Sequence, residues 1–296
     1  MNDYRPNVAA IERSRSVLEQ FQKHAEKEPW EARRDRLRKS LADGGDFRVK
    51  NDLATTLAHT GAAVEAVTLL EQIEAEKPGL YMTAANLGTA YELTGNNQKA
   101  LEWIRRGIER NAEAHGGTEW LHVRILEAKL AMSGDPKWLE SNSITGLLLE
   151  GRNSIEISAT GNCGEKVSAR QAKAALIHQL HERLQFVKPS DAIVGALLLD
   201  LGELLSEERT GRAEAYDVFK LAGIYLKGLS NVDYLQDRVD IYAITAARHQ
   251  RLPDARNKVL FLVFLSGAGL LLAILVIGLK RWIQRRWAGA EATARP

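Results

Sequence analysis

The chain has 296 residues, of which 45% are hydrophobic and 26% charged, and its formal net charge is +2. These are ordinary values for a folded globular protein, and so small a net charge gives no support to nucleic-acid binding. A single cysteine excludes a disulfide framework within the chain. With only 7 prolines and many Ala, Leu, Glu and Arg residues, the composition favours helix.

Residues 1–45 are predicted to form an N-terminal helical cap of two helices, broken at Pro29. The segment contains no apolar core of a secretory signal peptide. Its basic residues between 33 and 39 are interleaved with acidic ones, which is typical of a solvated helix face. We therefore predict no nucleic-acid partner.

Residues 46–140 contain an internal repeat. Two windows, 47–78 and 81–112, align at an offset of 34 residues. The matching pairs are Leu53 with Leu87, Ala54 with Gly88, Gly61 with Gly95, Ala66 with Ala100 and Leu70 with Ile104. A small residue at 54 or 88 lets two helices approach closely, and Gly61 and Gly95 permit the positive φ that a tight turn requires. Residues 118–132 continue with a further helix.

This period and pattern resemble the tetratricopeptide repeat (TPR), a helical hairpin that must stack on its neighbours to bury its apolar face. The resemblance implies a concave groove, lined by the first helix of each hairpin, that binds a protein partner. By position in the repeat, the groove residues would be Arg48, Asn51, Asp52, Thr55 and His59, followed by Met82, Ala85, Asn86, Thr89 and Leu93. Some members of the family clamp a peptide carboxylate, but only Asn86 and, in part, Arg48 fit that arrangement, so no such clamp is predicted.

Residues 141–167 interrupt the helical pattern. Two short runs rich in β-branched and apolar residues, 144–149 and 154–158, predict either a β-hairpin or an irregular loop. The segment ends in turn residues around Cys163. Insertions in solenoids often lie on a binding face.

Residues 168–252 are predicted to be further helical repeats, with helices over 168–186, 192–207 and 231–250. Leu201, Gly202 and Leu205 resemble the first helix of a TPR hairpin. Ala215 and Phe219, with Ala222, resemble the second.

Residues 253–287 are predicted to be a transmembrane helix and its flanks, followed by a tail, 288–296. The uncharged run begins at Val259 and ends at Leu279, and as a helix it would span about 31 Å, close to the hydrocarbon thickness of a bilayer. Basic residues flank both ends, so the charge rule hardly decides orientation. The absence of a signal peptide favours a cytosolic repeat domain with a C-terminal single-pass anchor.

Catalytic and metal chemistry receives little support from the sequence. His178 and His181 lie three residues apart, with Glu182 beside them, but no third or fourth ligand stands at a compatible spacing. Cys163 has no recognisable activating base. We therefore predict no cofactor, no metal and no enzymatic activity.

Together these features predict an all-α TPR-like solenoid with one transmembrane helix. The predicted function is a membrane-tethered scaffold or assembly adaptor whose partners are proteins at the membrane and, through 259–279, the lipid bilayer. The alternatives are a structural subunit of a membrane complex and an enzyme subunit that uses the insertion containing Cys163.

Overall fold

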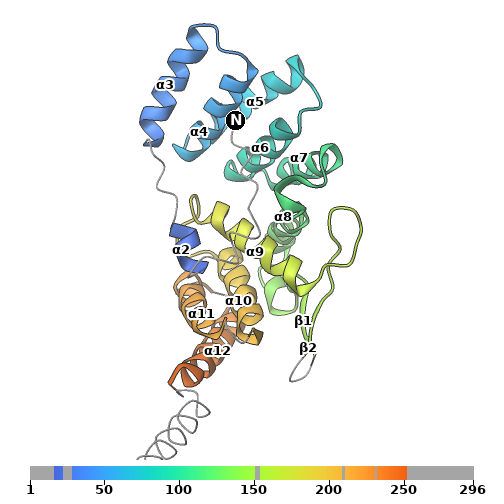
Figure 1. Ribbon diagram of the computed structural model, residues 1–296, viewed down its shortest axis with the longest axis vertical. Coiled ribbons are helices and arrows are strands. Elements are labelled where there is room, and N and C mark those ends of the chain that lie inside the picture. The colour runs from blue at the N-terminus through green and yellow to red at the C-terminus, as the bar shows by residue number, and fades with distance from the viewer. Residues whose placement is uncertain (1–16, 23–28, 151–153, 209–210, 231, 252–296) are drawn as a thin grey trace, which may run out of the picture. The chain divides into compact units, whose positions relative to one another are not determined.

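The computed structural model describes residues 17–22, 29–150, 154–208, 211–230 and 232–251 (Figure 1). The chain divides into two units, residues 1–246 and 247–296, and the described part of the second is the end of the last helix, 247–251. In the described ranges no helix has both the length and the apolarity needed to cross a bilayer. The predicted transmembrane segment, 259–279, lies outside those ranges, as does the beginning of the predicted cap.

The first half of the described chain consists of helices that, after the first short one, each pack against the next (Figure 1). They are α2 (Val17–Gln22), α3 (Trp30–Ala42), α4 (Phe47–His59), α5 (Ala63–Glu76), α6 (Tyr81–Leu93) and α7 (Asn97–Arg110). The two predicted repeats are the hairpins α4–α5 and α6–α7, so the prediction of helical hairpins is confirmed.

The hairpins form for the reasons that the repeat pattern suggests. Gly61 and Gly95 have φ of 82° and 81° at the two turns, a backbone conformation that glycine adopts without steric cost. A Cβ on Gly88 would lie 2.3 Å from the Cδ1 atom of Ile104. The missing side chain therefore lets α6 and α7 pack in close contact.

In its described residues, the second half adds short elements and five long helices. They are η1 (Ala114–Gly116), α8 (Glu119–Gly134), η2 (Trp138–Glu140), β1 (Leu147–Glu150), β2 (Ser154–Ile157), α9 (Ala169–Arg183), α10 (Ala192–Glu207), α11 (Arg212–Leu226) and α12 (Asp233–Arg251). The predicted insertion forms a β-hairpin, because β1 and β2 pair antiparallel with Leu147 opposite Ile157.

Side-chain caps fix the beginnings of the later helices. Ser168 and Gln171 form a reciprocal capping box at α9, and the Asp191 carboxylate accepts a hydrogen bond from the backbone N–H of Val194 at α10. Two predicted ends are corrected. Helix α9 stops at Arg183 rather than near 186, where the chain turns, and α12 begins at Asp233 rather than near 231.

The hairpin α10–α11 repeats the packing of α6–α7. A Cβ on Gly202 would lie 2.4 Å from the Phe219 ring, as one on Gly88 would meet Ile104. The degenerate repeat predicted at 201–222 therefore shares its close helix contact with the earlier one.

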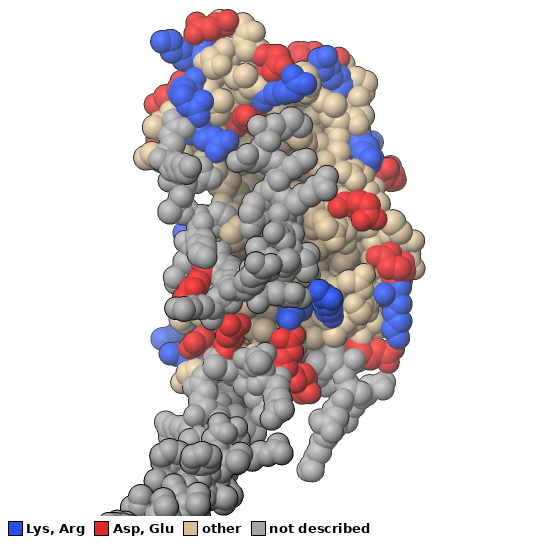
Figure 2. Space-filling view, in the orientation of Figure 1, with Lys and Arg blue, Asp and Glu red and all other residues tan. Residues whose placement is uncertain are grey.

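The buried side chains form two clusters that meet at α8. Leu126 belongs to the cluster of α3 to α7, whereas Leu121 and Ile125 belong to the cluster of α2, the β-hairpin and α9 to α12. Because both clusters use α8, this helix connects the two halves of the first unit. On the surface, Figure 2 shows basic and acidic side chains of the described residues interspersed over the visible face.

Candidate functional site

A cavity of about 720 Å³ lies where the first helices of the two repeats face α8 and α9. Successive turns of α6 contribute Met82, Ala85 or Asn86, Thr89 and Leu93, a spacing that places side chains on one helix face. The opposite wall comes from η1, α8 and α9, with side chains His115, Glu119, His122, Lys129, His178, Gln179, Glu182, Arg183 and Phe186.

Most of the predicted groove residues line this cavity. They are Thr55, His59, Met82, Ala85, Asn86, Thr89 and Leu93. The hydroxyls of Thr55 and Thr89 donate hydrogen bonds to carbonyls of their own helices, at 3.2 Å and 3.4 Å. These two side chains therefore offer mainly their methyl groups to the cavity.

Three predicted groove residues do not line the cavity. Arg48 is exposed and pairs with Asp46 at 3.0 Å. Asn51 is buried, with an exposed fraction of 4%, and its side-chain oxygen accepts a hydrogen bond of 3.0 Å from the amide of Asn86. Asp52 is exposed. These residues lie near the start of α4, before the helix reaches the cavity.

Two residues of the cavity lining, His59 and Phe186, belong to a stack of aromatic rings. The His59 ring lies between Trp30, at a centroid distance of 3.7 Å, and Phe186, at 4.5 Å. Phe186 follows α9, so the second half of the chain supplies one face of this stack. His59 is consequently held by its own chain, which the repeat pattern did not predict.

The lining also contains a buried carboxylate, Glu92, that contacts an arginine, a lysine and a histidine. Glu92 contacts Arg183 at 2.5 Å, Lys129 at 2.6 Å and His122 at 2.8 Å. Glu92 and Arg183 are each only 7% exposed at the side chain. A buried charge requires such partners, because leaving water is costly. The contacts tie α6 to α8 and α9.

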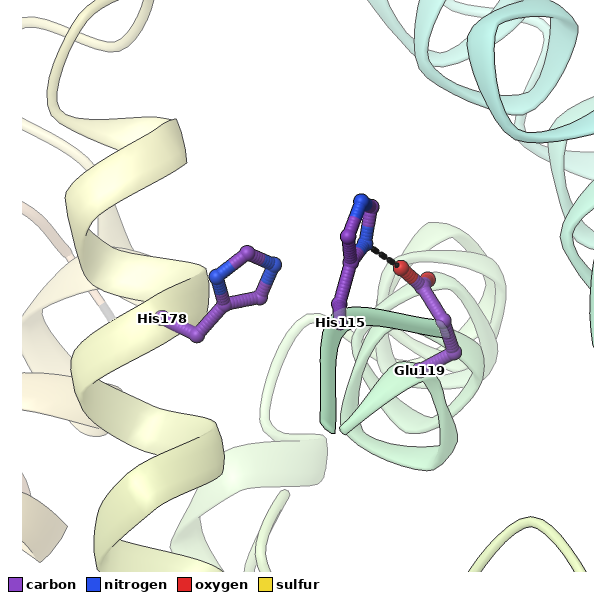
Figure 3. A group of neighbouring side chains, drawn as sticks. All are labelled: His115, Glu119 and His178. Carbon is purple, nitrogen blue, oxygen red and sulfur yellow. Dashed lines mark hydrogen bonds and ion pairs between the residues drawn. The ribbon is translucent and has the colours of Figure 1, made fainter. Parts of the chain in front are cut away.

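His115, Glu119 and His178 lie together beside this network (Figure 3). The Nδ1 atom of His115 is 2.5 Å from a carboxylate oxygen of Glu119. The ring of His178, on α9, faces His115 with a centroid distance of 4.8 Å (Figure 3). One suitable donor atom from each of the three residues lies within 4.8 Å of the others.

Burial and neighbouring charges shift the pKa values of the residues in and beside this cluster in different directions. Burial would raise the pKa of Glu119, but hydrogen bonds from His115 and His122 outweigh it and hold that pKa well below its usual range. Burial would lower the pKa of His122, but Glu119 and Glu92 raise it. Burial, helped by the charge of His115, lowers the pKa of His178 to about 4. His178 is therefore neutral near pH 7. His122 lies between the carboxylates of Glu92 and Glu119 and contacts both.

Sequence reasoning considered His178 only together with His181 and Glu182, and predicted no metal site. His181 is not in the cluster, and the neighbours of His178 come from η1 and α8, about sixty residues earlier. Cys163 is exposed and does not line the cavity. The polar character of Glu92, within an otherwise apolar turn of α6, was the available signal for the network.

Comparison with known proteins supports the repeat interpretation. Over 77 residues the chain is 41% identical to the "TPR repeat-containing protein YvcD" of Bacillus subtilis. The hairpins are TPR-like. The matched segment covers 26% of this chain and 16% of the Bacillus protein, so the chain spans less than a fifth of that relative. No protein-family model and no solved structure matches the chain.

Proposed function

We propose that the chain is a non-catalytic protein-interaction scaffold that binds a segment of a partner protein in the cavity between α6 and α9. The main support is that seven residues selected from the repeat pattern line this cavity: Thr55, His59, Met82, Ala85, Asn86, Thr89 and Leu93. The similarity to a TPR protein points to the same class of function. The step from fold to function is an analogy with that class.

The lining suggests the chemistry of the partner. Met82, Ala85 and Leu93 offer apolar surface, whereas Lys129 and Glu182 supply charge at the opposite wall. A volume near 720 Å³ lies in the usual range for ligand pockets. A short extended segment with an apolar side chain fits such a site better than a folded domain does.

The proposal includes a membrane anchor formed by residues 259–279. This uncharged run has the length of a bilayer-spanning helix. Tethering would raise the effective concentration of a partner in the same membrane. The repeat domain would face the cytosol.

Site-specific photocrosslinking in native membranes tests the binding part. A photoreactive residue at Thr89, in the cavity wall, should yield a defined protein adduct, whereas one at Val64, 73% exposed on α5, should not. Equal adducts at both positions, or none at Thr89, would refute binding in the cavity.

The anchor is tested separately by extraction of membranes at alkaline pH. The full chain should remain with the membranes, and a chain truncated after Arg256 should be released. Release of the full chain would overturn the anchor without affecting the crosslinking result.

A further inference from the structure

The cluster of His115, Glu119 and His178 brings three metal-binding side chains to one wall of the cavity (Figure 3). His115 lies in η1, Glu119 is the first residue of α8, and His178 lies in the middle of α9. Tetrahedral ligands with bonds of about 2.0–2.2 Å lie roughly 3.4 Å apart. The three donor atoms lie within 4.8 Å of one another. Side-chain rotations that bring them about 1–1.5 Å closer together would give the spacing of tetrahedral ligands.

His115 has a backbone feature that the ion-pair network does not explain. His115 has φ 52° and is the one non-glycine residue with positive φ in the part of the chain that the structure describes. Such a backbone costs about 1–2 kcal/mol and tends to occur where a side chain must be held for binding. Glu119 is buried; its Oε1 atom contacts His115 Nδ1 at 2.5 Å and its Oε2 atom lies 3.5 Å from His122 Nδ1.

His178 provides a third observation. Its side chain is buried, with an exposed fraction of 6%. Within the described residues its ring contacts His115 but has no hydrogen bond or ion pair. The side chain lines the cavity. Its nitrogen is available to a ligand that enters there.

We propose that His115, Glu119 and His178 form a binding site for one divalent transition-metal ion of the zinc class. Two imidazoles and one carboxylate suit Zn²⁺ and similar ions, whereas Mg²⁺ and Ca²⁺ prefer a shell of oxygen atoms. Three protein ligands leave a coordination position for water or for a group of the partner. This site goes beyond the proposed scaffold function and does not depend on it.

Metal titration of the purified full-length chain in detergent tests the proposal. The chain carries no polyhistidine tag, is stripped with a chelator, and is titrated with Zn²⁺ against a chromophoric competitor. We expect one equivalent to bind. H178A and E119Q should each weaken binding by more than the roughly 10–100-fold that loss of an outer-shell partner causes.

H181A is the matched control, because His181 lies on the same helix, one turn from His178, but outside the cluster. It should bind Zn²⁺ as the wild type does. Absence of stoichiometric binding, or equal affinity of H178A, E119Q and the wild type, would overturn the proposal and leave the cluster as part of an ion-pair network.

X-ray absorption of the zinc-loaded wild type gives a result that does not depend on the folding of any variant. Two coordinated imidazoles and additional oxygen ligands are expected. Fewer than two imidazoles, or sulfur from Cys163, would refute the assignment.

Discussion

Replacing Glu92 by Gln should destabilise the protein far more than the same change at an exposed glutamate. Glu92 is the one carboxylate that Arg183, Lys129 and His122 all contact in the described part of the chain. The amide is similar in size but carries no charge. The variant therefore leaves the buried charge of Arg183, the charge of Lys129 and the His122 ring beside a neutral side chain.

The magnitude follows from the burial of these groups. Removing one partner of a buried ion pair costs about 3–5 kcal/mol, because the remaining charge stays buried without compensation. The amide oxygen of glutamine retains one hydrogen bond, so we expect about 3 kcal/mol. For a domain of this size, each kcal/mol lowers Tm by roughly 2–4 °C. The expected decrease in Tm is therefore roughly 6–12 °C.

Glu127→Gln is the control. Glu127 pairs with Arg105 at 2.7 Å, but the two side chains are 46% and 55% exposed. Such a surface pair contributes about 0–1 kcal/mol. Thermal unfolding of both variants, followed by circular dichroism, makes the comparison. Equal changes in Tm would refute the argument that the buried network holds α6, α8 and α9 together.

Two further predictions concern helix packing and pH. Gly88→Ala should lower the free energy of unfolding, because its Cβ would lie 2.3 Å from Ile104, and overpacking of about 1–3 kcal/mol exceeds the ~1 kcal/mol gain in helix propensity. Gly107→Ala, whose Cβ would lie 3.7 Å from its nearest atom, should instead be stabilising. Urea unfolding measures both variants, and a change of the urea midpoint in the same direction for both would contradict this reasoning. Burial, followed by the charge of Asp200, raises the pKa of Glu203 to about 8. The folded state therefore keeps a proton that the unfolded chain releases near the ordinary pKa of glutamate. Because of this difference, the free energy of unfolding falls as pH rises from the unfolded-state pKa to the folded-state pKa. Glu203→Gln should remove this loss, and an unchanged difference between urea midpoints at about pH 5.5 and about pH 8 would contradict it.

The helical hairpins could be predicted because their determinants are local. The spacing of Gly61 and Gly95 at matching turns, and of Gly88 opposite a large apolar residue, is visible in the repeat itself. The same holds for the caps at Ser168 and Asp191. In each case the residues that decide the structure lie within one hairpin or one helical turn.

The cavity could be predicted only in part. Repeat positions on α6 and at the end of α4 line it, whereas Arg48 and Asn51 at the beginning of α4 do not. The repeat pattern assumes that successive first helices continue one open groove. Here α9 packs across from α6, and Phe186 stacks on His59. The second half of the chain therefore decides which groove positions remain at the cavity.

The His–Glu cluster could not be predicted from spacing, because its residues belong to separate elements. His178 meets His115 and Glu119 only when α9 lies against the start of α8, and the ring of His115 takes its position from a left-handed backbone. The Glu92–Arg183 pair, which joins residues 91 apart in the chain, fixes the end of α9. It follows that Glu92, although it is not a ligand, should influence zinc affinity by holding His178 in place. Zinc titration of the Glu92→Gln variant tests this dependence, and an affinity equal to that of Glu127→Gln would show that α9 keeps its position without the pair.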